Sequence, residues 1–276
     1  MQQMEREPLT LKSIDRALRP ALNSFVKRVS YDSEVELWRV MQDYPQVIHV
    51  MNHGPMFGPW PAAAYLAKKA VDNGGGDRTP FAMFHRIFFK IPIVNRVIRK
   101  RLNSPRAFSF EEVLEHFRAG LYTDFMVLPE GDNCNYGNLE EIRPFRSHRY
   151  LELAVLLEAP ILITIHRGTE SWATQIALDN ASMIFLKTFA PSVYYRVRET
   201  RIVNWQSLPW VIPVFQMKTK LYHPKLKKAA LSQDPEERQQ QIEAESLNVR
   251  KAMEAMLAEL HQQQPDTVPA DVHTQS

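Results

Sequence analysis

Hydrophobic positions along the chain follow two spacings, one helical and one strand-like. At residues 11–29, apolar side chains recur every three or four positions, which predicts an amphipathic helix whose other face is basic. Four β-rich runs then alternate with four helical patterns: strands are expected at 46–51, 80–84, 123–128 and 160–166, and helices at 57–72, 94–102, 110–119 and 147–158. This alternation is typical of an α/β domain with a mostly parallel central sheet flanked by helices.

The pattern changes after this alternating region. Residues 182–190 and 193–203 are predicted to form two further strands, and an aromatic-rich stretch follows at 205–222. This stretch is expected to belong to the core, although its Trp and Tyr residues also suit a membrane interface. A long C-terminal helix is predicted at 235–262, because apolar residues recur there on one face.

Composition limits how these elements are organised. The chain has 276 residues, of which 45% are hydrophobic and 24% are charged, as in an ordinary globular protein. We expect an N-terminal amphipathic helical segment at 1–44, one α/β domain at 45–262 and a disordered tail at 263–276. The single cysteine, Cys134, excludes an internal disulfide and is interpreted as a small semi-buried thiol.

Several classes of function are disfavoured by motifs that the sequence lacks. Neither GxGxxG nor GxxxxGK[ST] occurs, so a glycine-rich nucleotide loop is not expected, and HExxH, GxSxG and CxxC are missing as well. His85, His116 and His148 do not have metal-ligand spacing. The basic residues of 96–106 lack interleaved aromatics, so an anionic headgroup suits them better than nucleic acid.

The sequence also bears on membrane association. No apolar run approaches the roughly 18 residues that a spanning helix needs, and the first residues lack the apolar core of a secretory signal. The basic helix at 11–29 has two interpretations. It packs on its own domain, as most amphipathic helices do, or it lies on an anionic membrane surface.

Candidate chemistry lies in three loops at predicted strand ends, where α/β folds place their functional residues. These loops contain Asn52-His53-Gly54, Pro129-Glu130-Gly131-Asp132 and His166-Arg167-Gly168. A histidine can act as a general base because its pKa lies near neutrality. His53 would then need a partner on its other ring nitrogen, which holds the imidazole in one tautomer.

Four short blocks follow one another within residues 45–168. They read Asn52-His53-Gly-Pro-Met-Phe-Gly58, a segment ending in Lys100-Arg101, Leu128-Pro129-Glu130-Gly131-Asp132-Asn133, and Ala159-Pro160-Ile161. Their order, and the spacing between Arg101 and Glu130, resemble the glycerolipid acyltransferase family, whose type member acylates 1-acylglycerol-3-phosphate. The family pattern has Asn-His-x4-Asp in the first block and Phe-Pro-Glu-Gly-Thr-Arg in the third.

This resemblance implies transfer of a fatty acyl group from acyl-CoA or acyl carrier protein to the hydroxyl of a lysophospholipid-type acceptor. Such a reaction belongs to phospholipid biosynthesis or remodelling, on the cytoplasmic face of a membrane to which the protein binds peripherally. No metal or redox cofactor is expected. The catalytic residues would be His53, as the general base, and Glu130. The expected acceptor-binding residues are Asn52, Arg101, Gly131, Asp132, Arg143 and Arg146.

The first block departs from the family pattern, because Gly58 stands where the aspartate is expected. Another carboxylate, from Glu130 or Asp132, could orient His53 instead. A backbone carbonyl or a water molecule could also hold the ring. Alternatively, the chain keeps the fold as a lipid-binding or scaffold protein without the activity, or it is a hydrolase that passes the acyl group to water.

Overall fold

The computed structural model describes residues 7–83, 90, 95, 96, 103, 106, 108–207, 210–263, 270 and 271. Its α-helices are α1 (Leu11–Phe25), α2 (Leu37–Asp43), α3 (Pro59–Asp72), α5 (Phe110–Arg118), α6 (Arg149–Leu157), α7 (Asn180–Phe189), α8 (Pro191–Val197) and α9 (Pro235–Gln262). Its strands are β1 (Val29–Ser33), β2 (Val47–Met51), β3 (Pro80–Ala82), β4 (Asp124–Val127), β5 (Ile161–Arg167), β6 (Ala173–Ala177), β7 (Ile202–Gln206), β8 (Phe215–Tyr222) and β9 (Ala270–Asp271). Short 3₁₀ turns are η2 (Gly131–Asn135), η3 (Glu170–Trp172) and η4 (Lys228–Ala230).

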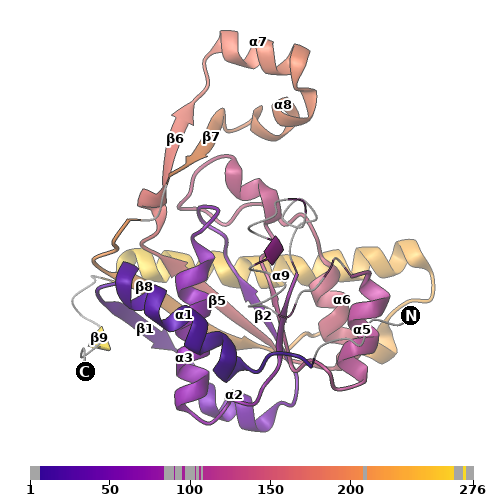
Figure 1. The fold of residues 1–276 in the computed structure, drawn as a ribbon. Coiled ribbons are helices and arrows are strands. Elements are labelled where there is room, and N and C mark those ends of the chain that lie inside the picture. Colours follow the sequence, from indigo (N-terminus) through magenta and orange to yellow (C-terminus); the bar gives the residue numbers. More distant parts are fainter. Residues whose placement is uncertain are drawn as a thin grey trace.

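A mostly parallel sheet forms the centre of the molecule (Figure 1). In the described part of the chain it has seven strands, in the order β3-β4-β2-β5-β8-β1-β9. Strands β3, β4, β2 and β5 run parallel, β8 is antiparallel to β5, and β1 is parallel to β8. The predicted α/β class is therefore confirmed, as are the long C-terminal helix and the helix at the N-terminus.

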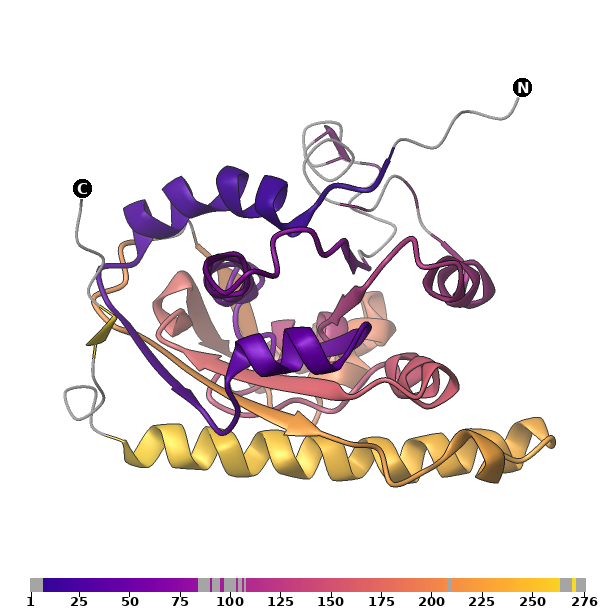
Figure 2. The same ribbon diagram turned by 90° about the horizontal axis from the view of Figure 1, so that it is seen from below.

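Helices cover both faces of this sheet (Figure 2), so the central strands are apolar on both sides. On β5, Ile161, Ile163 and Ile165 face the core that α5, α6 and α9 close, whereas Leu162 faces the core beneath α1, α2 and α3. The two cores hold the strand ends in fixed positions. The loops at the carboxyl ends of β2, β4 and β5 therefore extend from rigid elements.

The N-terminal segment contributes to the sheet as well as to the helical layer. Helix α1 ends at Phe25, and residues 29–33 form β1, which pairs with β8. The predicted helix therefore ends before residue 29, and the predicted helical segment at 1–44 contains this strand between α1 and α2. Val26 ends the helix because it pairs with Ile212 in an isolated parallel bridge. The apolar stripe of α1 faces the core, which confirms the first of its two interpretations.

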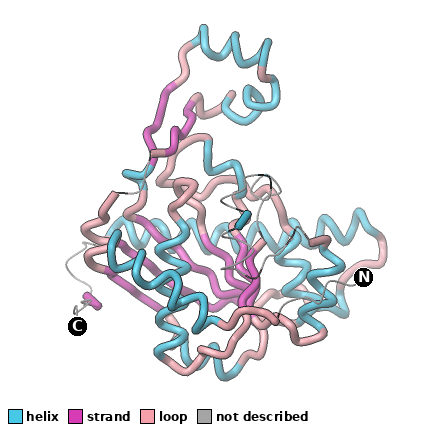
Figure 3. The backbone as a smooth tube through the Cα atoms, in the orientation of Figure 1, coloured by secondary structure: helices cyan, strands magenta, loops and turns pink. Residues whose placement is uncertain are grey.

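Residues 173–206 form an arm that projects from the body (Figures 1 and 3). Strands β6 and β7 pair in an antiparallel hairpin, and α7 and α8 lie at its far end. The prediction of two strands at 182–190 and 193–203 is wrong, because the chain is helical at 180–189 and 191–197. Asp179 caps α7 by accepting a hydrogen bond from Ser182 N, and Pro191 starts α8.

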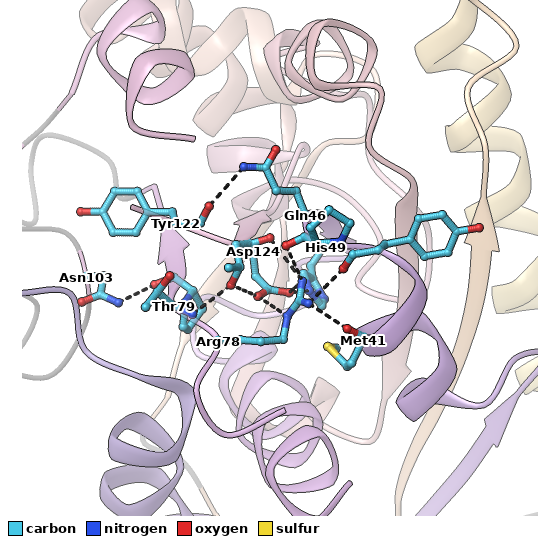
Figure 4. Close-up of polar contacts among 12 residues, drawn as sticks. Met41, Gln46, His49, Arg78, Thr79, Asn103, Tyr122 and Asp124 are labelled. Carbon is cyan, nitrogen blue, oxygen red and sulfur yellow. Dashed lines mark hydrogen bonds and ion pairs between the residues drawn. The ribbon is translucent and has the colours of Figure 1, made fainter. Parts of the chain in front are cut away.

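A buried polar cluster closes the opposite edge of the sheet, at the start of β4 (Figure 4). Arg78 Nε donates to Asp124 Oδ2 at 2.7 Å, and His49 Nε2 lies 2.9 Å from Asp124 Oδ1. The guanidinium also donates to the carbonyl oxygens of Met41 and Tyr44. The cluster joins β2, β4 and the end of α2, so its role is structural.

The remaining predictions at the chain ends concern residues that are only partly described. The predicted helix at 94–102 lies mostly outside the described residues. Of the tail at 263–276, residues 270 and 271 form β9 against β1, which is more order than the sequence predicts. The other tail residues, apart from 263, are not described.

Candidate functional site

The loops after β2, β4 and β5 meet at the carboxyl edge of the sheet, because β2 lies between β4 and β5. His53 follows β2, Glu130 follows β4, and His166 is the penultimate residue of β5, just before the loop that follows this strand. Three loops that are far apart in sequence are therefore neighbours in space, as predicted for strand ends of a parallel sheet.

Glu130 joins two of these loops through its carboxylate. Oε1 accepts a hydrogen bond from His53 N at 2.7 Å, and Oε2 accepts one from Arg143 N at 2.7 Å. The residue is only 1% exposed. Burial raises the pKa of Glu130 to about 7, although both backbone N–H groups favour the ionised form. The carboxylate therefore fixes the backbone of His53 and does not contact its ring.

The His53 ring is held by a backbone carbonyl. Its Nδ1 lies 3.3 Å from Pro55 O, and a carbonyl oxygen can only accept, so Nδ1 carries the proton in this contact. Nε2 then keeps its lone pair. Burial lowers the pKa of His53 below its ordinary value of 6.5, so the neutral ring is the favoured form at pH 7. A neutral imidazole with one fixed tautomer is able to accept a proton at Nε2.

Gly58 leaves no room for the family aspartate. A Cβ at this position would lie 2.8 Å from His53 O, 2.9 Å from Thr169 Oγ1 and 3.0 Å from Pro55 O. The backbone carbonyls of His53 and Pro55 therefore lie against residue 58. The Pro55 carbonyl, and not a carboxylate, contacts the His53 ring and orients it. Of the alternatives that the sequence leaves open, the described residues contain the backbone carbonyl, and neither Glu130 nor Asp132 bonds to the ring.

Asn52 ties the first loop to β5. Its Nδ2 donates to His166 O at 2.9 Å, and its Oδ1 accepts from His166 N at 2.8 Å. Both ends of the amide thus bind backbone, which extends the pairing of β2 with β5 by one residue. Asn52 is buried and bonded to the backbone on both sides, so it has a structural role beside His53.

His166 is a part of this site that the predicted residue set does not include. Its Nε2 donates to Asn52 O at 3.0 Å, and burial lowers its pKa to about 3. Within the described residues its Nδ1 has no hydrogen-bond partner, and neither does Thr169 Oγ1. A Cβ on Gly54 would lie 3.6 Å from His166 Cε1 and 3.7 Å from Thr169 Oγ1. Two unsatisfied buried polar groups thus lie beside the His53 loop.

Asp132 forms an ion-pair cluster with two arginines. Its Oδ1 lies 2.8 Å from Arg146 Nη1, and Oδ2 is paired with Arg196 of α8. Burial opposes ionisation of Asp132, but the two guanidinium groups outweigh it and lower its pKa. Gly131 precedes it with a φ of 55°, in the left-handed region that glycine tolerates. The cluster leaves Arg146 half-exposed at the surface of the turn.

Arg143 and Arg101 are the other two arginines expected to bind the acceptor. The Arg143 backbone N–H binds Glu130, while its guanidinium packs over Gly137 and pairs with Glu141 Oε2 at 3.3 Å. Its side chain is therefore engaged away from His53. Arg101 lies outside the described residues. Cys134 is buried nearby, and burial raises the pKa of its thiol, which keeps it protonated.

Comparison with known proteins adds no family assignment. No protein-family model matches the sequence, and a search of curated proteins finds no significant match. In the part of the chain that the structure describes, no helix is both long enough and apolar enough to cross a bilayer.

Proposed function

We propose that this protein is an acyltransferase that moves a fatty acyl group from acyl-CoA or acyl carrier protein to the hydroxyl of a lysophospholipid-type acceptor. The observation that carries the proposal is the state of His53, which is neutral, held at Nδ1 by the Pro55 carbonyl and free at Nε2. The bond between His53 N and Glu130 adds support, because it joins the first and third sequence blocks. The proposed location is the cytoplasmic face of a membrane.

In this mechanism His53 removes the proton from the acceptor hydroxyl. The hydroxyl oxygen attacks the carbonyl carbon of the thioester while its proton passes to His53 Nε2. The C–S bond then breaks, the leaving thiolate takes the proton from His53, and the products are an ester and a free thiol. General base catalysis of this kind contributes about 10²- to 10⁴-fold in rate.

Glu130 supports the same step as a positioning residue. Its two bonds to backbone N–H groups fix the entry of the His53 loop and the segment that leads to Arg146. The half-exposed Arg146 at the neighbouring turn suits the phosphate of the acceptor, because a guanidinium forms paired hydrogen bonds with phosphate oxygens. Arg101 remains the expected second phosphate ligand.

The proposal is tested by acyl transfer from labelled acyl-CoA and acyl carrier protein to a panel of lysophospholipids. His53→Ala should reduce kcat/KM by about 10²-fold or more without changing the fold. The matched control is His261→Ala, which removes an exposed histidine of α9 and should leave the rate unchanged. Equal rates for wild type and His53→Ala would refute the role of His53. Free fatty acid as the product would identify a hydrolase.

The pH profile gives an independent check. Because burial lowers the pKa of His53, the limb of kcat/KM that belongs to its protonation should lie below pH 6.5. The Glu130 carboxyl titrates near 7, so a second limb there should vanish in Glu130→Gln while the lower limb remains. A single limb above 7 in both proteins would contradict the assignment.

A lipid-binding protein without turnover is the second candidate, and the contact between His53 and a carbonyl favours it. A carbonyl dipole stabilises the imidazolium less than a carboxylate does, which lowers the power of the base. This candidate predicts that lysophospholipid binds wild type and His53→Ala equally and that no product forms with either donor.

A further inference from the structure

The projecting arm carries several large apolar side chains that are exposed to solvent. In α7, Ile184 and Phe189 are 68% and 72% exposed, and Phe185 is exposed as well. Met183 is the only buried residue of this helix. A cluster of large apolar side chains exposed to solvent marks a surface that binds a protein, a membrane or a ligand.

One face of the hairpin beneath α7 binds the body through polar side chains, and the opposite face is mostly apolar. Residues on the first face bind the body: Gln175 Nε2 donates to Gly137 O, and Asn204 Nδ2 donates to Cys134 O. Because strand side chains alternate, Ile176, Val203 and Trp205 share the opposite face. Trp205 is 68% exposed there. The apolar face of the hairpin is thus the one directed away from the body.

The arm carries a small excess of positive charge, in which Arg196 is paired with Asp132 of the body and Arg198 Nη2 lies 3.8 Å from Glu199 Oε1. Residues 173–206 contain four basic and two acidic side chains, namely Lys187, Arg196, Arg198, Arg201, Asp179 and Glu199. Lys187, Arg198 and Arg201 are exposed, and Arg198 lies over the ring of the exposed Tyr195 at 5.7 Å. An exposed Tyr beside an arginine, with an exposed Trp on the same arm, matches the headgroup region of a bilayer, where aromatic rings and cations both gain stabilisation.

We propose that the arm of residues 173–206 docks on an anionic lipid bilayer and inserts the apolar residues of α7 and β7 into its interface. Charge complementarity selects this occupant, because the apolar residues are accompanied by basic ones. The choice of a bilayer also rests on the proposed function, since a lysophospholipid acceptor must be drawn from a membrane.

The base of the arm is connected to the loop that carries His53. Gln206 Oε1, at the end of β7, accepts a hydrogen bond from Met56 N at 2.7 Å. Phe57, the residue after Met56, is 46% exposed. Docking of the arm therefore brings the carboxyl edge of the sheet toward the lipid surface from which the acceptor is taken.

Binding to sedimented vesicles tests the proposal. The vesicles are pure phosphatidylcholine, or phosphatidylcholine with about a third phosphatidylglycerol. Wild type should bind the anionic vesicles, and the triple variant Ile184→Ser, Phe185→Ser, Phe189→Ser should partition about 100-fold more weakly. The matched control, Leu121→Ser with Leu247→Ser, removes exposed leucines of the body and should bind as wild type does.

Two outcomes would overturn the proposal. One is wild-type partitioning that the triple variant keeps. The other is a wild-type dimer that this variant converts to a monomer in ultracentrifugation, with no vesicle binding by either protein, which would identify a second copy as the occupant. Quenching of tryptophan emission by brominated lipids checks insertion directly, and Trp205→Phe should remove most of the quenching.

These results remain distinguishable from failure of the proposed function. Vesicle binding needs no turnover, so His53→Ala should partition as wild type does even if no acyl transfer is found. If acyl transfer occurs, the triple variant should keep the wild-type kcat on a monodisperse short-chain acceptor and lose rate only on acceptor embedded in vesicles.

Discussion

Introducing by Gly58→Asp the aspartate that the acyltransferase pattern has at this position should destabilise this protein. Gly58 has φ −55° and ψ −41°, a conformation open to any residue, so the conflict comes only from the space around the new side chain. The Cβ would lie at most 3.0 Å from the carbonyl oxygens of His53 and Pro55. A carboxylate beyond it would then be buried beside two carbonyl oxygens that cannot donate to it, with the Thr169 hydroxyl as the one neighbouring donor.

The size of the effect follows from two opposing contributions. Replacing glycine at a compatible backbone position stabilises a fold by about 0.4–1 kcal/mol through the unfolded state. Overpacking costs about 1–3 kcal/mol. Gly58→Ala should therefore lose about 1–2 kcal/mol, which corresponds to a fall in Tm of about 2–8 °C in a chain of this size. Gly58→Asp should lose more, because its charge is desolvated as well.

Thermal unfolding and acyl transfer are measured on both variants and on Gly76→Ala. At Gly76 a Cβ meets only Lys12 side-chain carbons, at 3.5 Å and beyond, so this control should change stability by less than about 0.5 kcal/mol. Because the loop must open, Gly58→Asp should also reduce the proposed transfer. A variant that unfolds at the wild-type Tm and transfers acyl groups faster would show that the Pro55 carbonyl is not what orients His53.

Two further predictions concern buried carboxylates. The pKa of Glu130 rises from 4.5 to about 7 on folding, so its contribution to stability is present below pH 4.5 and lost as the pH rises through about 7. Glu130→Gln lacks this dependence, and the wild-type advantage in urea unfolding should shrink by about 2–3 kcal/mol between pH 5 and pH 8; an advantage that grows would contradict the burial argument. Burial opposes ionisation of Asp124, but His49 and Arg78 outweigh it and hold the pKa at about 2, so Asp124→Asn should cost about 3–5 kcal/mol at pH 7. That cost should diminish as the pH falls from about 4 toward 2, while kcat per folded molecule stays unchanged, because the cluster lies at the other edge of the sheet.

The elements with a clear period could be predicted from the sequence, and the arm could not. Residues 235–262 show one apolar face and form α9 over the predicted range. Ser109 caps α5 and forms a capping box with Glu112, a signal that the sequence contains. In the arm, β-branched and aromatic residues suggested strands at 182–190 and 193–203, whereas Asp179 and Pro191 were the signals for helices.

For the site, sequence placed the loops but not the contacts within them. His53 and Glu130 are 77 residues apart, and their bond uses the backbone of one and the side chain of the other. A motif predicts side chains, so it suggested a carboxylate for the imidazole. The partner is instead the Pro55 carbonyl, and the space at Gly58 is closed by backbone oxygens. Both depend on the path of the loop, which no residue pattern encodes.

These contacts link the His53 loop to its surroundings at three points. Glu130 binds His53 N, Asn52 fixes the start of the loop to β5, and Met56 N donates to Gln206 at the base of the arm. A loop that is fixed by three contacts restricts the orientation of the His53 ring through its backbone. The contact with the Pro55 carbonyl then suffices to orient the imidazole without a carboxylate. If the arm docks on lipid as proposed, the docking is transmitted through β7 to the hydrogen bond between Met56 N and Gln206. Breaking it with Gln206→Ala should therefore weaken transfer to embedded acceptor more than vesicle binding.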